Sequence, residues 1–166
     1  MDNLINYLIE CNNKIGKIKV SQDFINYRDN LKDVFRPNSR SETQRTMNAD
    51  CVLFEYQLLL NKFVHKPTHK GHDFIWNDQK VDLKLIASKY FNIPDDKVMW
   101  YMNNIHNKEV TSFVFYKYEN PPERPLVVGD TVSFRIVEAV SAKEVMDNIR
   151  ISNKTNGYYY IVNDVQ

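Results

Sequence analysis

Apolar residues recur at every second position in one short stretch of the chain, residues 73–84 (DFIWNDQKVDLK). This period of two predicts a pair of β-strands joined as a hairpin. The turn is expected at Asn77 and Asp78, because both residue types tolerate the positive φ angles of a two-residue turn. The predicted apolar face of this hairpin is suited to packing and carries Phe74, Trp76, Val81 and Leu83.

The opposite face of the predicted hairpin brings two acidic residues together. A two-residue turn places Asp73 directly opposite Asp82, with their Cβ atoms about 5 Å apart. Lys84 lies two residues beyond Asp82 and therefore points to the same face. Like charges that face each other destabilise a sheet, and a divalent cation would offset the repulsion. The pattern thus indicates a cation site.

Apolar residues at helical spacing predict three helices before the hairpin. The first covers residues 2–14, the second begins after Ser21 and continues to residue 35, and the third covers residues 47–63. Residues 36–46 (RPNSRSETQRT) form a polar, arginine-bearing connector. We interpret this connector as a solvated loop, with phosphate contact as the alternative.

The third predicted helix carries a carboxylate inside its apolar stripe. Glu55 lies one turn after Cys51 and one turn before Leu58 and Leu59. A carboxylate on a core-facing side is costly unless it is paired, protonated or bound to a cation. Alternatively, Glu55 lies at the edge of the stripe and reaches solvent. The helix alone does not decide between these readings.

Further strands and a short helix are predicted after the hairpin. A segment from Asp95 to Met102 fits a helix or a strand equally well, and Ser141 with Glu144 forms a capping box that opens a helix ending at Ile149. The predicted strands are residues 110–118, 131–139 and 157–162. We therefore expect an α/β or α+β fold with a central mixed sheet flanked by helices.

Length and composition are those of one ordinary globular domain. The chain has 166 residues and a formal net charge of +1, so any anion binding must come from local patches. It contains no apolar run near the roughly 18 residues of a membrane span, and its N-terminus lacks signal-peptide features. Cys11 and Cys51 lie in apolar patterns, which indicates buried thiols in a reducing compartment. We expect a cytoplasmic protein without a membrane partner.

The residue usage adds a weak indication of source. The chain is rich in Asn, Lys, Ile and Tyr and poor in Gly and Ala. This bias is compatible with an AT-rich genome, including a viral one, in which case the host cytoplasm is the expected location.

Glu55, Asp73, Asp82 and Lys84 together suit phosphodiester hydrolysis. Carboxylate oxygens are the ligands that Mg²⁺ prefers, and Mg²⁺ keeps several waters. A lysine beside the metal can hold or deprotonate the attacking water and offset charge on the phosphate.

In this order, the four residues resemble the core of the PD-(D/E)xK nuclease superfamily, the restriction-endonuclease-like proteins that include phage nucleases. The resemblance covers residues 47–162, and it implies a restriction-endonuclease-like core. We divide the chain into an N-terminal helical extension, residues 1–46, and a nuclease-like core, residues 47–166, within one compact unit. His72 replaces the proline found before the first aspartate in many members, and Leu-Ile-Ala-Ser follows Lys84 where more polar residues are frequent.

The resemblance implies a metal-dependent DNA endonuclease that hydrolyses phosphodiester bonds with a Mg²⁺-activated water. Glu55, Asp73 and Asp82 would bind Mg²⁺, with Mn²⁺ as a substitute, and Lys84 would contact the nucleophilic water. A double-strand cut would favour a homodimer, because one site cuts one strand at a time. Backbone phosphates would meet a basic set of lysines: Lys62, Lys66, Lys70 and Lys80.

Three other readings remain open. The hairpin charges could be ordinary surface pairs, or the chain could be a non-catalytic nucleic-acid-binding or regulatory protein on the same fold. The third reading is an RNA-directed nuclease in which aromatic residues stack on bases: Tyr158, Tyr159 and Tyr160.

Overall fold

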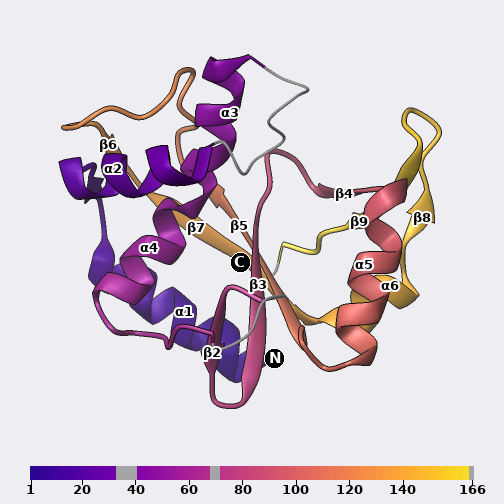
Figure 1. The fold of residues 1–166 in the computed structure, drawn as a ribbon. Helices are drawn as coiled ribbons and strands as arrows, with labels where there is room; N and C mark the ends of the chain where they lie inside the picture. Colours follow the sequence, from indigo (N-terminus) through magenta and orange to yellow (C-terminus); the bar gives the residue numbers. More distant parts are fainter. Residues whose placement is uncertain (33–40, 68–71, 165–166) are drawn as a thin grey trace.

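The central sheet has four strands in the order β2-β3-β5-β7 in this computed structural model, which describes residues 1–32, 41–67 and 72–164 (Figure 1). Strand β3 runs antiparallel to β2 and parallel to β5, and β7 runs antiparallel to β5. The expectation of a central mixed sheet is therefore confirmed. Its strands are β2 (Phe74–Trp76), β3 (Gln79–Leu85), β5 (Ser112–Tyr118) and β7 (Phe134–Ser141).

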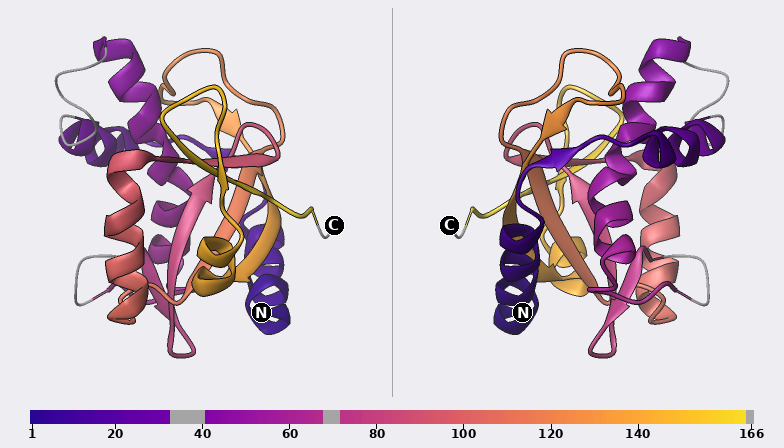
Figure 2. Two further views of the ribbon diagram at one scale, coloured as in Figure 1. Left: turned by 90° about the vertical axis from the view of Figure 1, so that its right-hand side faces the viewer. Right: turned by 90° about the vertical axis from the view of Figure 1, so that its left-hand side faces the viewer.

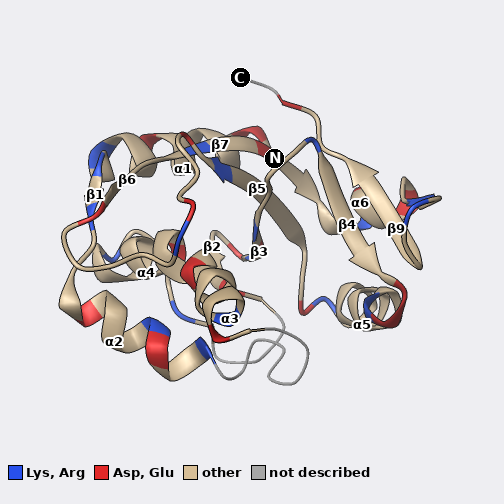
Figure 3. Ribbon diagram, turned by 90° about the horizontal axis from the view of Figure 1, so that it is seen from above, with Lys and Arg blue, Asp and Glu red and all other residues tan. Residues whose placement is uncertain are grey.

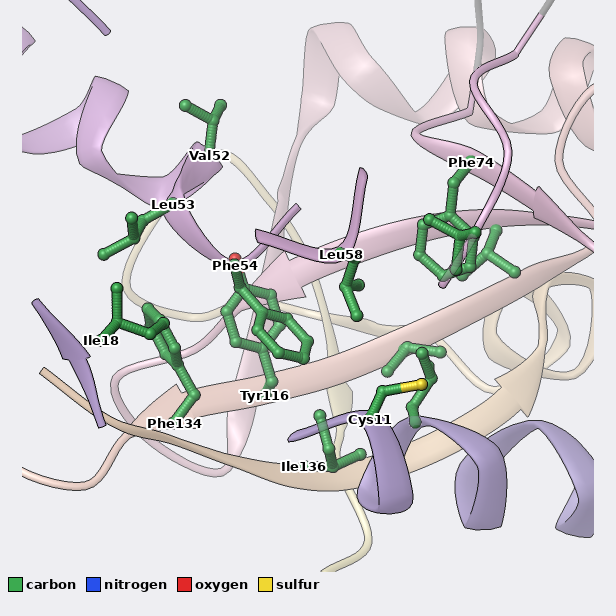
Figure 4. Close-up of a cluster of buried hydrophobic side chains, with 14 of the residues drawn as sticks. Cys11, Ile18, Val52, Leu53, Phe54, Leu58, Phe74, Tyr116, Phe134 and Ile136 are labelled. Carbon is green, nitrogen blue, oxygen red and sulfur yellow. The ribbon is translucent and has the colours of Figure 1, made fainter. Parts of the chain in front are cut away.

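One face of this sheet is covered by the helices from the first part of the chain, which lie to its left in Figure 1. Helix α1 (Asp2–Ile15) packs against β7, and α4 (Leu53–Leu60) contributes Phe54 and Leu58 to the same apolar cluster. Tyr116 on β5 and Phe134 on β7 meet Phe54 with ring centroids 5.1 and 5.4 Å away (Figure 4). The N-terminal helix thus shares its core with the central strands.

The other face of the sheet packs against α5 (Asp95–His106) and α6 (Ala142–Asp147), which lie nearest the viewer in the left panel of Figure 2. Phe113 and Phe115 of β5 point into this second cluster, whereas Val114 and Tyr116 point into the first. The alternation of side chains along β5 therefore gives the sheet two buried faces, as expected for a strand at its centre.

Two small sheets complete the architecture. A three-stranded sheet has the order β4-β9-β8 and flanks α5, and a two-stranded sheet joins β1 to β6. Their strands are β1 (Ile18–Lys19), β4 (Tyr90–Pro94), β6 (Thr131–Val132), β8 (Arg150–Ile151) and β9 (Gly157–Ile161). The terminal strand predicted at residues 157–162 is confirmed as β9.

The helical region before the hairpin differs from its prediction. Instead of one helix over residues 47–63, there are α3 (Glu42–Ala49), a 3-10 turn η2 (Asp50–Val52) and α4. The solvated-loop prediction is wrong for residues 42–46, because the Ser41 side chain accepts a hydrogen bond from Gln44 N and starts α3 there. The rest of the predicted connector falls largely in residues 33–40, outside the described residues.

Other boundaries follow local capping signals. Ser21 accepts a hydrogen bond from Phe24 N and opens α2 (Gln22–Leu31), and Ser141 accepts one from Glu144 N and opens α6. The ambiguous segment after Pro94 is helical as part of α5. Both cysteines are free thiols, Cys11 buried and Cys51 half-buried. Within the described ranges, no helix is long and apolar enough to cross a membrane.

Candidate active site

The hairpin forms with the predicted turn and register. Asn77 and Asp78 have φ angles of 46° and 62°, as a two-residue turn with positive φ at both positions requires. The register pairs Trp76 with Gln79 at the turn and Phe74 with Val81 at the far end. The local sequence therefore suffices to define the hairpin.

The ladder ends one pair short of the two aspartates. The Asp73 amide donates to Val81 O at 2.7 Å, and the Asp73 carboxylate accepts a hydrogen bond from Leu83 N at 2.6 Å. Asp73 is therefore not the ladder partner of Asp82, although the register predicted that pairing. Its side chain instead caps the edge of β3 that β2 leaves unpaired beyond Val81.

Asp82 and Lys84 lie on the face of β3 that packs toward α5. In the parallel ladder Asp82 pairs with Phe113 and Lys84 with Phe115, whose rings belong to the second cluster. Asp82 is buried, with 6% of its surface exposed, and Lys84 Nζ lies 3.3 Å from Asp82 Oδ2. This ion pair gives the buried aspartate one positive neighbour.

Burial and neighbouring acids raise the pKa values of Asp73 and Glu55. Burial raises the pKa of Asp73 well above its ordinary value, and so do the charges of Asp82 and Glu55 and a hydrogen bond between the Asp73 and Asp82 carboxyl groups. Burial and the charge of Asp82 raise the pKa of Glu55 to about 7. The acids from the hairpin and from α4 thus form one electrostatic cluster.

The structure places Glu55 on α4, between the buried Phe54 and the half-buried Tyr56. Glu55 itself is half-buried. The side chain is therefore partly covered by the core, as the core-facing reading of the helix predicted, and partly open to solvent, as the edge reading predicted. Its charge is near enough to the hairpin to raise the pKa of Asp73.

Lys84 remains a cation in this arrangement. Burial lowers its pKa, but Asp82 and a hydrogen bond with the Tyr101 hydroxyl oppose that effect, and the net result is a pKa above its ordinary value. Lys84 Nζ also lies 5.0 Å from the ring centroid of Tyr101 and 5.9 Å from that of Phe91. A charged ammonium donates hydrogen bonds but does not accept a proton, which favours an electrostatic role over that of a base.

The predicted basic set is only partly assembled at the acids. Lys66 is exposed, and its charge lowers the pKa of Glu55 against the effects of burial and Asp82. Lys62 is exposed just after α4, and Lys80 is half-buried two residues before Asp82. Lys70 lies outside the described residues. Acidic and basic positions are interspersed over the elements of the fold (Figure 3), in line with the net charge of +1.

Sequence reasoning missed two tyrosines that border the cluster. Tyr101 of α5 contacts Lys84, and Tyr27 of α2 lies near enough for Glu55 and Asp73, after burial, to raise its pKa. Tyr27 also meets Tyr56 with ring centroids 5.2 Å apart. The sequence contains no signal for either contact, because both depend on how distant helices pack against the hairpin.

A pocket of about 920 Å³ continues past the carboxyl end of β3. Leu85 and Ile86, which directly follow Lys84, line it together with Arg124 and Arg135. Arg124 pairs with Asp130 and Arg135 pairs with Asp164. The pocket therefore lies beyond the end of β3, and its lining contains none of the four candidate site residues.

The carboxylates of this site are better suited to bind Mg²⁺ with two protein ligands than with three. In the described part of the chain, no group of three or more His, Cys, Asp and Glu side chains is close enough to hold a metal ion. Mg²⁺ is commonly bound by one or two carboxylates, with waters and substrate phosphates as its other ligands. Asp73 and Asp82 are close enough for the charge of Asp82 to raise the pKa of Asp73, and these two carboxyl groups fit that requirement.

Comparisons of the chain with protein-family models, with curated proteins and with solved structures found no match.

Proposed function

We propose that this chain is a metal-dependent nuclease that hydrolyses phosphodiester bonds in DNA, built on a restriction-endonuclease-like core. The observation that supports it best is Asp73 at the unpaired edge of β3, where it accepts a hydrogen bond from Leu83 N, beside the Asp82–Lys84 ion pair, with Glu55 near enough for its charge to raise the pKa of Asp73. Acids whose pKa values are raised by burial and by one another make a poor structural device but a good seat for a divalent cation and a phosphate.

The residues divide the work as follows. Asp73 and Asp82 offer oxygen ligands from neighbouring strands, and Glu55 adds a carboxylate from α4. When bound, Mg²⁺ would polarise a phosphoryl oxygen and lower the pKa of the attacking water. Lys84 directs its ammonium to the same place, where it stabilises the negative charge that develops on the phosphate. Water forms the new bond to phosphorus, and the bond to the leaving sugar oxygen breaks.

Substitution of Lys84 tests this proposal most directly. We expect Lys84→Ala to reduce Mg²⁺-dependent DNA cleavage by about 1,000-fold, because an electrostatic group at the reacting phosphate contributes on that scale. Asp82→Ala should abolish cleavage as well. Lys143→Ala is the matched control, since Lys143 is an exposed lysine on α6 that pairs with Asp147. Undiminished cleavage by a folded Lys84→Ala protein would rule the assignment out.

A non-catalytic nucleic-acid-binding protein is the second candidate. It is favoured by the internal satisfaction of the acids, since Asp73 accepts from Leu83 N and Asp82 pairs with Lys84. Calorimetric titration with Mg²⁺ or Mn²⁺ separates the candidates. Binding that disappears in Asp73→Asn and Asp82→Asn supports the nuclease, whereas absence of binding supports the second candidate.

The choice of DNA over RNA needs its own experiment. Labelled single-stranded, duplex and branched DNA and RNA should be digested side by side with Mg²⁺. Preferential cleavage of DNA is expected, and preferential cleavage of RNA would replace the proposal with an RNA-directed nuclease. Cuts in both strands at one position would indicate that two subunits act together.

A further inference from the structure

Lys84 is held between an acid and an aromatic ring. Its Nζ lies 3.3 Å from Asp82 Oδ2 on one side and 5.0 Å from the Tyr101 ring centroid on the other. The Tyr101 hydroxyl is also a hydrogen-bonding partner of this ammonium. A lysine side chain is long and flexible, so holding its charge at one point requires contacts of this kind.

Tyr101 is itself fixed by packing. It is 8% exposed, and its ring meets Phe113 at 5.6 Å and Phe91 at 6.1 Å in edge-on geometry, with Trp100 at 5.1 Å. Phe113 is the ladder neighbour of Asp82. The ring that contacts Lys84 is therefore anchored to the strand pair that carries the acids, and it moves with them.

We propose that Tyr101 is a positioning residue that holds the Lys84 ammonium beside Asp82 and aims it at the scissile phosphate. The inference rests on the proposed function and adds to it a residue from α5. An ammonium has three hydrogen-bond donors. Asp82 takes one and the neighbouring Tyr101 hydroxyl is placed to take a second, which leaves at least one for the phosphate or the attacking water.

The aromatic ring serves this purpose better than another carboxylate would. A ring face attracts a cation through its quadrupole, but it carries no net charge that would compete with the phosphate. Packing against Tyr101 also restricts the flexible stem of Lys84. The lysine thus stays charged, ordered and available.

Steady-state kinetics on single and double variants test the proposal. Tyr101→Phe removes the hydroxyl and keeps the ring, and we expect it to lower kcat for DNA cleavage about tenfold, as loss of one charge-assisted hydrogen bond would. The KM for DNA should stay within roughly twofold, because Tyr101 is only 8% exposed and offers little surface for DNA. Tyr101→Leu, which also removes the ring, should lower kcat further.

The Lys84→Ala background separates positioning from mere packing. If Tyr101 acts through Lys84, then Tyr101→Phe should change the residual rate of Lys84→Ala by less than roughly twofold. A multiplied loss in the double variant would overturn the proposal, and so would a wild-type kcat in Tyr101→Phe. Tyr160→Phe is the matched control, because Tyr160 is also 8% exposed and its hydroxyl also contacts a charged group, Glu138.

A second readout does not depend on activity. In wild-type protein the ε-methylene protons of Lys84 should resonate upfield of those of other lysines, because they lie beside an aromatic ring. Tyr101→Leu should remove this shift, and Lys84→Ala identifies the signal. An unshifted Lys84 in the wild type would overturn the inference. A shifted Lys84 in a protein that cuts no nucleic acid would support the contact while removing the proposed function.

Discussion

Two groups of buried acids in this molecule have opposite surroundings. Asp50, in η2, is 2% exposed and receives hydrogen bonds from Arg28 Nη1 at 3.1 Å and from Leu126 N at 3.0 Å. Asp82 is 6% exposed and lies with Asp73 and Glu55, two further acids, against a single lysine. Asp50 therefore has a positively charged partner and a backbone donor. Asp82 instead lies where negative charges outnumber positive ones.

The ionisation of the two groups reflects this difference. Burial raises the pKa of Asp50 above its ordinary value, and the hydrogen bonds from Leu126 N and Arg28 offset only part of that increase. Burial also raises the pKa of Asp73, and there Asp82 and Glu55 add to the increase. Burial alone therefore does not distinguish a functional acid from a structural one. The sign of the neighbouring charges does, because only the second arrangement gains from a bound cation.

The largest effect on stability should come from the matched pair. We expect Arg28→Met to lower the free energy of unfolding by roughly 3–5 kcal/mol, because it leaves the Asp50 charge buried without its partner. Urea denaturation at neutral pH measures this change. Adding Asp50→Asn to Arg28→Met should restore part of the lost stability. A decrease of less than about 1 kcal/mol in Arg28→Met alone would show that the ion pair does not stabilise Asp50.

In the candidate site, we expect removal of an acid to raise the free energy of unfolding instead of lowering it. Asp73→Asn should raise the free energy of unfolding of the metal-free protein at pH 8 by roughly 1–3 kcal/mol, because it removes a carboxyl group whose ionisation the fold disfavours and keeps an oxygen for Leu83 N. Denaturation in EDTA tests this, with Asp50→Asn as the destabilised counterpart. Equal losses in the two variants would erase the contrast between the two groups.

The pH dependence follows from Glu55, whose pKa is about 7 in the fold and 4.5 as its ordinary value. Since the folded protein holds the proton more tightly, its contribution to stability is present below pH 4.5 and is lost as the pH rises through 7. We expect a decline of roughly 1–2 kcal/mol over this range without metal, less than the full pKa difference implies because solvent screens the half-buried Glu55, and Glu55→Gln should remove it. Mg²⁺ affinity should rise over the same range, because a bound carboxylate must be deprotonated. A flat titration of the wild type would contradict the expected pKa.

The smallest effect concerns a third buried acid, Glu138. It accepts hydrogen bonds from the Tyr160 hydroxyl at 3.1 Å and from Asn163 N at 2.9 Å. Tyr160→Phe should therefore lower the free energy of unfolding by about 1 kcal/mol and leave cleavage unchanged. Thermal denaturation checks the expected loss of stability, and the cleavage assay checks the unchanged activity. Loss of cleavage at full stability would place Glu138 among the functional acids.

The sequence predicted correctly those elements that depend on neighbouring residues alone. The hairpin follows from period-two alternation and from two turn residues that accept positive φ, and the starts of α2 and α6 follow from Ser21 and Ser141. The start of α3 was missed although Ser41 has the same capping role. In that case the polar, arginine-bearing composition of the segment outweighed a signal that was present.

By itself, the sequence determined that Asp82 and Lys84 share one face of a strand and that Asp73 lies across the hairpin from them, because a strand alternates and a turn sets the register. Only the tertiary structure decided that the ladder stops before Asp73, that Glu55 on α4 faces these acids, and that Tyr101 on α5 supports the lysine. These contacts join segments separated by tens of residues. Their formation depends on how the two faces of the sheet are filled, and no local spacing encodes that packing.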